Sequence, residues 1–302
     1  MDRLKPDLLV LNSGELLALL ERLPSATPKV LVAHNVESVL MRAQAAKLGL
    51  RLPILRPLAQ RDSRKMAKLE TTGAKKIRNI ISISTEDTEY FRKLDECMNV
   101  CTIFPTFHYP PFQPEAAVPR RPLRVGFMAR MSWWPNREGA DWFVAEVLQH
   151  LPAGTIKAHF FGGGSEAFAG RHPDLTAHGF VESMNDIWRN CDIMICPVFS
   201  GSGVNIKFAE ALYNRMPVLA TRVAGLGLPP IDDMAIMYKE TAEEWREFLA
   251  SDDALRLAEQ RPSPKVSTLF SAERQTETLK EFFVQMMGIW LEKNAARTSA
   301  LQ

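Results

Sequence analysis

Short apolar runs alternate with helical patterns along this 302-residue chain, and this alternation limits the possible folds more than any other feature. Four runs in the first part predict strands at residues 8–11, 29–34, 79–84 and 100–104. A helical pattern between the second and third runs covers residues 38–48. Strands that alternate with helices through short connections favour a parallel sheet covered on both faces. The first part therefore predicts an α/β fold.

The second part of the chain repeats this alternation. Apolar runs predict strands at residues 123–129, 157–161, 175–178, 192–197 and 217–220, and helices fit between them at 139–151, 184–190 and 204–215. Four prolines between residues 108 and 121 interrupt all periodicity there. We expect an N-terminal Rossmann-like domain at 1–112, a linker at 113–122, a second Rossmann-like domain at 123–265, and a segment at 266–302 that crosses back toward the first domain. Its helical pattern, over residues 272–290, has an apolar stripe that indicates packing. Two such domains in series predict parallel sheets that face a ligand cleft.

The composition is typical of a globular protein without a membrane span. Hydrophobic residues make up 46% and charged residues 24% of the chain, and no run of eighteen apolar residues occurs. The N-terminus lacks the apolar core of an export signal, so we expect a cytoplasmic protein. The four cysteines, at positions 97, 101, 191 and 196, lack paired CxxC spacing, which favours reduced thiols over the alternative of a zinc site.

Positive charge is concentrated in one region, although the net charge is only +2. Residues 47–78 contain ten lysines and arginines against Asp62 and Glu70. Two interpretations stay open for this basic region. It is either a solvated helical face or a patch for an anionic membrane or an acidic acceptor such as a lipid-linked phosphate, which would place the protein at the inner face of the membrane. Nucleic acid is not expected, because no aromatic residues interleave with the charges.

The most informative motif is a glycine-rich loop that leads from a buried strand into a helix at residues 200–212. Free N–H groups at a helix start form an anion site, and glycines allow a diphosphate to approach the backbone. Lys207 lies about one turn inside the helix and could add positive charge. Glu210 follows one turn later, where a carboxylate could accept hydrogen bonds from ribose hydroxyls. The alternative is an ordinary glycine-rich turn.

A second motif, at residues 125–143, joins a strand, an aromatic loop and a helix that begins near Gly139. Arg130 ends the strand at the side where such folds bind ligands, and a guanidinium suits phosphate oxygens. Alternatively, Arg130 could pair with a carboxylate between the domains.

These motifs together resemble the glycosyltransferase family 4 signature, that of the group 1 glycosyltransferases with a GT-B fold. The resemblance rests on residues 201–211 (GSGVNIKFAEA), 215–221 (RMPVLAT) and 225–228 (GLGL), and on the aromatic segment 131–136 with Trp142 and Phe143 behind it. It also includes residues 161–165 (FGGGS) and 178–183 (HGFVES), so it covers about 123–228. The resemblance implies transfer of a sugar, of the hexosyltransferase type, from a nucleoside diphosphate sugar to an acceptor hydroxyl. It further implies retention of configuration and a role in polysaccharide or glycan biosynthesis.

The same resemblance implies roles for individual residues. It places Glu210 on the donor ribose, Arg130 and Lys207 on the phosphates, and Arg137 near a second basic position, one residue out of register. It places the loop at Phe180 and Val181 on the nucleotide base. It places the loop at Ser202, Gly203 and Val204 beside the donor sugar and its phosphates. His34 resembles the family's histidine near the reacting sugar, so His34 and Ser202 are the two catalytic candidates.

The chain departs from the family pattern at position 202 and in its N-terminal part, and it lacks one common metal-binding motif. Ser202 replaces a glutamate expected at the donor sugar. No Asp-x-Asp motif occurs, so we expect no metal and no cofactor beyond the donor, which is UDP- or GDP-linked. By comparison with the family we expect a shortened N-terminal domain, because the family's first strand and glycine-rich loop have no counterpart in the motifs of this sequence. A glycan or lipid-linked acceptor is expected, as are homo- or hetero-oligomers that protect sheet edges. The alternatives are a non-catalytic or half-enzyme subunit that needs a partner, and a nucleotide-sugar epimerase.

Overall fold

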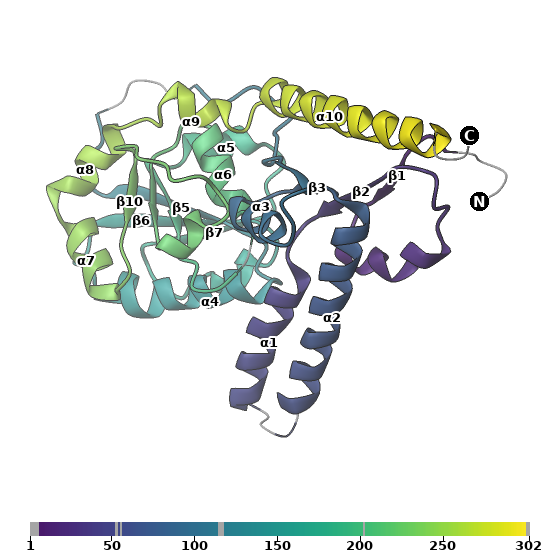
Figure 1. Ribbon diagram of the computed structural model, residues 1–302. Coiled ribbons are helices and arrows are strands. Elements are labelled where there is room, and N and C mark those ends of the chain that lie inside the picture. The colour runs from purple at the N-terminus through teal and green to yellow at the C-terminus, as the bar shows by residue number, and fades with distance from the viewer. Residues whose placement is uncertain (1–5, 52–53, 55, 114–117, 202, 300–302) are drawn as a thin grey trace. The chain divides into compact units, whose positions relative to one another are not determined.

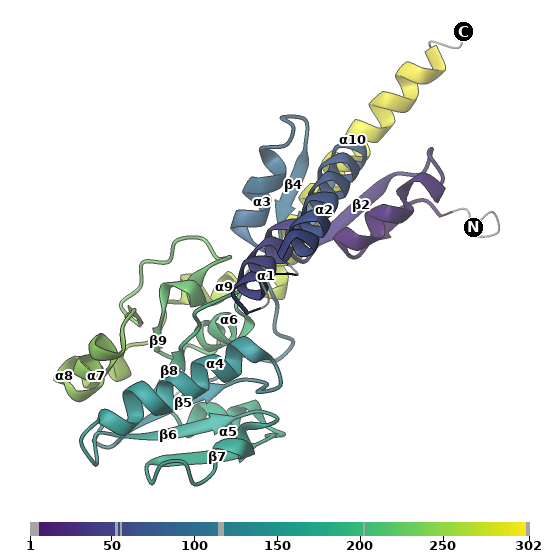
Figure 2. The same ribbon diagram turned by 90° about the horizontal axis from the view of Figure 1, so that it is seen from below.

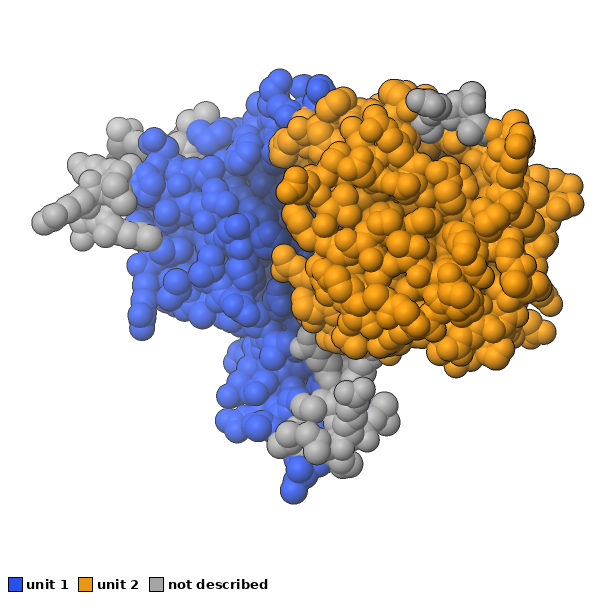
Figure 3. Space-filling model, turned by 180° about the vertical axis from the view of Figure 1, so that it is seen from behind, with its two compact units in different colours: residues 1–104, 273–302 blue, residues 105–272 orange. Residues whose placement is uncertain are grey.

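The computed structural model describes residues 6–51, 54, 56–113, 118–201 and 203–299, and the chain divides into two compact units (Figure 3). The first unit comprises residues 1–104 and 273–302, and the second comprises 105–272. The sequence interpretation placed a linker at 113–122, of which residues 114–117 lie outside the described residues, and began the C-terminal segment at 266. In the structure the chain passes between the units at 104–105 and again at 272–273.

The first unit contains a four-stranded parallel sheet in the order β1-β2-β3-β4 (Figure 1). Its strands are β1 (Leu9–Leu11), β2 (Lys29–Ala33), β3 (Asn79–Ser82) and β4 (Asn99–Thr102). Its helical segments are η1 (Gly14–Arg22), α1 (Glu37–Arg51), α2 (Arg56–Ile77), α3 (Thr85–Arg92) and α10 (Ala272–Ser299). All four strands occur where the apolar runs predicted them.

Both faces of this sheet are covered. Successive residues of a strand point to opposite sides, so neighbours in β3 show what covers each face. Ile80 of β3 packs into a cluster with residues of η1, α2 and α3, including Leu17 and Phe91. Its neighbour Ile81 packs instead with Phe282 and Met286 of α10. The last helix therefore completes the core of the first unit, although it is more than 160 residues distant from β4 in the sequence (Figure 2).

The second unit contains a six-stranded parallel sheet in the order β10-β9-β8-β5-β6-β7. The strands are β5 (Leu123–Met128), β6 (Ile156–Phe161), β7 (Leu175–Gly179), β8 (Ile193–Cys196), β9 (Val218–Ala220) and β10 (Ile236–Tyr238). The helical segments are α4 (Trp134–Trp142), η3 (Phe143–Val147), η4 (Leu148–His150), η5 (Ser165–Phe168), α5 (Met184–Arg189), α6 (Ile206–Tyr213), η6 (Arg222–Gly225), α7 (Ala242–Ala250), α8 (Asp252–Glu259) and α9 (Pro264–Thr268). The chain runs outward from β5 to β7 and then returns to β8 beside β5, which creates the topological switch point of a doubly wound sheet.

Helix α4 begins earlier than the sequence pattern predicted. We expected a start near Gly139, but the helix begins at Trp134 with Pro135 in its first turn, a position where the missing N–H of proline is harmless. Gly139 instead lies where the helix touches the end of β8. A Cβ at this position would come within 1.9 Å of the Pro197 carbonyl oxygen, so only glycine allows this close packing.

Strands β6 and β7 place two imidazoles side by side, with 3.0 Å between Nδ1 of His159 and Nε2 of His178. Burial, together with the nearby His178, lowers the pKa of His159 from 6.5 to about 4. The folded chain thus disfavours a proton that the unfolded chain accepts near pH 6.5. The contribution of His159 to stability is therefore complete above that pH and is lost as the pH falls toward 4.

We expect the free energy of unfolding of the second unit to fall by about 1 kcal/mol between pH 7.5 and about pH 5, a value reduced for the partial exposure of the ring. Urea titrations at the two pH values measure this. His159→Gln should reduce the pH dependence and leave a smaller part from His178, whose pKa is also lowered by burial, whereas His150→Gln, which changes an exposed histidine, should retain it in full. An equal pH dependence in all three proteins would contradict the assignment.

No helix among the described residues is long and apolar enough to cross a membrane.

Candidate functional site

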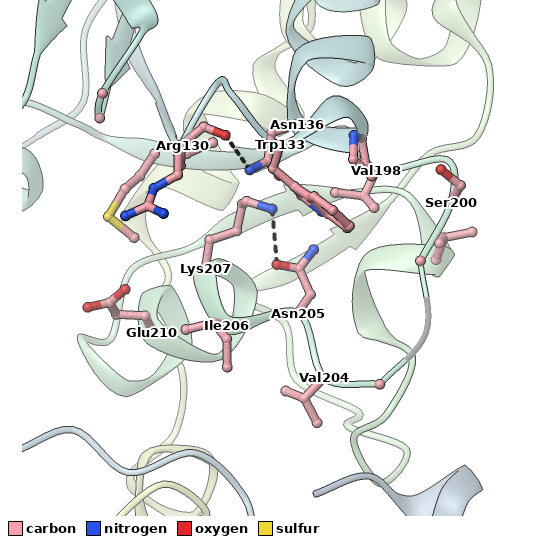
Figure 4. A pocket seen from close by; sticks show the side chains of 18 of the residues that line it. Arg130, Trp133, Asn136, Val198, Ser200, Val204, Asn205, Ile206, Lys207 and Glu210 are labelled. Carbon is pink, nitrogen blue, oxygen red and sulfur yellow. Dashed lines mark hydrogen bonds between the residues drawn. The ribbon is translucent and has the colours of Figure 1, made fainter. Parts of the chain in front are cut away.

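A cavity of about 530 Å³ opens in the second unit at the carboxyl ends of its strands. Its wall is formed by residues after β5, β6 and β7, by the loop after β8, and by the first turns of α6 (Figure 4). Because β5 and β8 are neighbours at the switch point, the segments that follow them diverge and leave this space. The residues of the wall that could contact a ligand include Arg130, Trp133, Phe180, Gly203, Val204, Asn205, Lys207 and Glu210.

The loop after β8 leads into α6 through a side-chain cap. Oδ1 of Asn205 accepts a hydrogen bond from the backbone N–H of Phe208 at 3.4 Å, which is a typical N-cap contact. Gly203 has a φ of 71° and Gly227 one of 89°. A Cβ on Gly227 would lie 2.7 Å from the backbone of Gly203 and Val204, so the segment at Gly227 presses directly against this loop. The loop is therefore held from both sides at the start of the helix.

Lys207 is half-buried in the cavity wall and forms no ion pair among the described residues. Its Nζ donates to Oδ1 of Asn205 at 3.3 Å, and burial lowers the pKa of the amino group. Burial deprives the Lys207 ammonium of part of its hydration, and the helix N-terminus beside it is also positive. A bound anion compensates both charges, so this place favours an anion.

Arg130 lies beyond the end of β5, with its side chain exposed. The Nδ2 of Asn136 donates to the Arg130 carbonyl at 2.8 Å and fixes the backbone of the turn. The guanidinium has no hydrogen bond or ion pair with the described residues, and both Arg130 and Lys207 line the cavity (Figure 4). Two unpaired cations in one cavity can bind two phosphate groups.

Glu210 lies at the opposite end of the cavity wall from Ser200 (Figure 4). The hydroxyl of Tyr109 donates to its Oε1 at 2.7 Å, and Nδ2 of Asn214 donates to that hydroxyl at 3.2 Å. Burial raises the pKa of Glu210, whereas the Tyr109 hydrogen bond favours the carboxylate. Because Tyr109 contacts Oε1, the other oxygen can accept hydrogen bonds from a ligand.

Not every candidate from the sequence lies at this cavity. Arg137 forms an ion pair with Asp141 at 3.7 Å and lies over the Phe168 ring, because the early start of α4 turns it to that side. Val181 is half-buried and is not part of the cavity wall, whereas Phe180 is, with 78% of its side chain exposed. Ser202 lies outside the described residues.

His34 belongs to the first unit, one residue beyond β2. Its Nε2 lies 3.0 Å from Oδ1 of Asn12, and the ring is exposed.

Three residues of the site have no role in the sequence interpretation. Trp133 lines the cavity with 54% of its side chain exposed, Asn205 caps α6, and Tyr109 contacts Glu210. The N-cap could have been found from the sequence, since asparagine is a preferred cap before a helical pattern. Tyr109 could not, because 101 positions separate it from Glu210.

No group of three or more histidine, cysteine, aspartate or glutamate side chains that could hold a metal ion occurs in the part of the chain that the structure describes.

Comparison with protein families finds one match. Residues 122–249, which include every residue of the cavity wall, match the family model described as glycosyl transferases group 1. No curated protein matches the sequence.

Solved structures of similar fold include several that contain a nucleotide. Anabaena HepE in complex with UDP and glucose aligns with a TM-score of 0.63 at 14% identity, over 92% of this chain and 78% of that chain. Sucrose-phosphate synthase from Thermosynechococcus elongatus aligns with a TM-score of 0.64 at 16% identity, over 94% and 74%. The apo form of WaaB, a lipopolysaccharide outer core galactosyltransferase, aligns with a TM-score of 0.59 at 10% identity, over 94% and 76%. At these identities the comparison establishes the fold, which is GT-B.

Proposed function

We propose that this chain, which has the GT-B fold and whose residues 122–249 belong to the glycosyl transferases group 1 family, transfers a sugar from a nucleoside diphosphate sugar to an acceptor hydroxyl. The observation that carries the proposal is the pair of unpaired cations, Arg130 and Lys207, in a cavity whose wall also holds the carboxylate of Glu210. Together they offer positive charge for a diphosphate and an acceptor for ribose hydroxyls.

The proposed chemistry requires stabilisation of the departing diphosphate. Negative charge develops on the diphosphate as the bond to the sugar breaks, and fixed cations and N–H groups lower the energy of that state. Arg130, Lys207 and the backbone N–H groups at the start of α6 would take this role. We infer that the chain needs no metal, that the configuration of the sugar is retained, and that a hexose is transferred during glycan or polysaccharide assembly.

The roles of the remaining candidates are also proposals. The backbone at Phe180 and Val181 would contact the base, and Gly203 and Val204 would lie beside the donor sugar, with Ser202 near its reacting end. His34 would act near the reacting sugar. UDP-glucose is the first donor to test, because HepE is similar in fold and has been solved with it.

Calorimetric titration with UDP and GDP tests the donor site. We expect one of the two nucleotides to bind, and Glu210→Ala to weaken that binding by about 1.5–3 kcal/mol, since hydrogen bonds to a charged acceptor are lost. Glu259→Ala, which changes an exposed carboxylate at the end of α8, is the matched control and should bind like the wild type. Equal binding in Glu210→Ala would remove Glu210 from the site.

Turnover separates the proposal from its alternatives. Release of nucleotide together with a glycosylated acceptor supports transfer, and an epimerised donor would indicate an epimerase instead. Tight nucleotide binding without turnover on any acceptor would favour a subunit that requires a partner.

The basic region suggests which surface of the protein contacts the acceptor. Six exposed basic side chains fall on one face of α2 when the helical period is applied, and they are Arg61, Arg64, Lys65, Lys68, Lys75 and Lys76. Lys47 and Arg51, which the sequence interpretation included, lie outside the described side chains. Ile54 and Leu58, before and at the start of this helix, are exposed by 86% and 54%. A cationic face beside exposed apolar side chains is typical of helices that lie on anionic membranes, so we propose a peripheral contact with a lipid-linked acceptor there.

The triple change Arg61→Glu, Lys65→Glu, Lys68→Glu should lower affinity for vesicles that contain anionic lipid by at least about 100-fold, because each cation near the surface contributes about 1 kcal/mol. Vesicle co-sedimentation measures this. The control is a triple reversal of exposed basic residues in the second unit, Arg222, Arg256 and Lys265. Equal loss in both variants would mean that α2 has no special role.

A further inference from the structure

A second cavity, of about 400 Å³, lies at the opposite edge of the second unit's sheet. Arg124 is the second residue of β5, and Asp192 immediately precedes β8, so both line this cavity at the amino ends of their parallel strands. The candidate nucleotide cavity lies at the carboxyl ends of the same strands. The two cavities therefore have different walls and share no residue.

Both oxygens of the Asp192 carboxylate in this second cavity already accept hydrogen bonds from Arg124. Nη2 of Arg124 donates to Oδ1 of Asp192 at 2.6 Å, and the backbone N–H of Arg124 donates to Oδ2 at 2.8 Å. Nη1 of Arg124 donates to the Arg189 carbonyl at 2.8 Å. Arg124 and Asp192 thus form an ion pair without net charge. Asp192 therefore cannot fully neutralise a further cation in the cavity.

The remaining arginines have no carboxylate of their own. Arg189 and Arg261 line the cavity, and neither forms an ion pair among the described residues. Nη1 of Arg261 donates only to backbone carbonyls, those of Ala258 and Gln260. Burial lowers the pKa of Arg261, and the positive charge of nearby Arg215 lowers it further, whereas the Asp192 carboxylate offsets part of this effect. The cavity therefore carries an excess of positive charge in a partly desolvated place.

An unsatisfied donor lies in the same wall. Trp188 lines the cavity and is 1% exposed, and its indole Nε1 is buried without a hydrogen-bond partner among the described residues. Nε of Arg215, whose charge acts on Arg261, is also buried and unpartnered. Buried N–H groups without acceptors are rare in native proteins, because each one forfeits the hydrogen bond it made with water.

A ligand with negative charge and several acceptor oxygens would both neutralise the excess positive charge and accept a hydrogen bond from the unpartnered N–H group. We propose that this cavity binds a small oxyanion, a phosphate- or carboxylate-bearing molecule, at a site separate from the nucleotide cavity. Arg189 and Arg261 neutralise its charge, and the Trp188 N–H donates to one of its oxygens. The cavity is larger than a single phosphate, and its apolar residues Phe112 and Met216 leave room for an apolar part of the ligand.

Thermal unfolding with sodium phosphate at constant ionic strength tests the site, with sodium acetate as the carboxylate arm. We expect about 10 mM phosphate or acetate to raise the Tm of the second unit by about 3–5 °C if the dissociation constant is near 1 mM. The anion with the larger shift identifies the class. Lys207→Met should retain this shift, because it changes only the nucleotide cavity.

Arg261→Met is the decisive variant. It should raise the Tm without anion, because one of two repelling cations is removed, and it should abolish the part of the anion shift that Lys207→Met retains. If it does not fold, the exposed Arg189→Gln should reduce the shift instead, whereas Arg222→Gln, an exposed arginine elsewhere in the unit, should leave it unchanged. An undiminished shift in Arg261→Met or Arg189→Gln, a shift lost in Lys207→Met, or no shift with either anion would overturn the proposal.

Discussion

Lys207→Met should weaken binding of the nucleotide by about 100-fold and lower turnover by a further factor of about 10²–10³. The ammonium is half-buried, is hydrogen-bonded only to Asn205, and lacks an ion pair among the described residues. Its charge is therefore available to a diphosphate, and the interaction should strengthen as the bond to the sugar breaks. Calorimetry gives the affinity, and steady-state kinetics with UDP-glucose give the turnover.

The same substitution should stabilise the protein without ligand. Burial lowers the pKa of Lys207, so the folded state disfavours its charged form, and methionine of similar length removes that cost. We expect the free energy of unfolding to rise by about 1 kcal/mol. A variant that loses both binding and stability would indicate a structural role for Lys207 and would contradict its assignment to the diphosphate.

The pH dependence of binding provides an independent test. A bound diphosphate favours the protonated amine, so affinity should be highest below the lowered pKa of Lys207 and should decline as the pH rises through it. The titration is run well above pH 6, near which phosphate groups complete their ionisation. Lys207→Met should show no decline over this range, and Lys265→Met, which changes an exposed lysine, should behave like the wild type.

Glu70→Ala should destabilise the first unit by about 2–4 kcal/mol, because two N–H groups lose their acceptor in a buried place. Glu70 is 1% exposed and caps the start of α1 from α2. Its Oε1 accepts the N–H of Glu37 at 2.6 Å, and its Oε2 accepts the N–H of Ser38 at 3.1 Å. Asp87 adds a third such contact, to the N–H of Val36 at 3.3 Å.

Hydrogen exchange is the suitable measurement, since a two-unit chain need not unfold in one step. The amides at the start of α1 should lose most of their protection in Glu70→Ala, whereas Glu96→Ala, an exposed control, should retain it. Glu70→Gln keeps one carbonyl acceptor and should lie between the two.

The pH profile adds a second criterion. Burial raises the pKa of Glu70, so the wild type gains stability as the pH falls through that raised value, and Glu70→Gln should lack this gain. Unchanged protection in Glu70→Ala would show that Asp87 alone suffices as the cap.

Local patterns in the sequence determined most of the secondary structure. The nine predicted strands all occur. A buried parallel strand is a short apolar run between turns, and such a run can be recognised from its own residues alone. Strand β10 (Ile236–Tyr238) was not predicted from the sequence. The spacing of Lys207 and Glu210 places both in the opening turns of α6, and the glycines before them mark the loop, so this part of the site was visible in the sequence.

Tertiary structure decided what distant residues contribute. Tyr109 contacts Glu210 across 101 positions, and Glu70 caps a helix that begins 33 positions earlier. Neither contact leaves a periodic trace, because each depends on where two separate elements pack. Arg137 shows the same limit, since the early start of α4 turned it toward Asp141 and Phe168. Sequence by itself thus determined the elements and the anion-binding loop of this protein, whereas packing decided which side chains hold and complete the site.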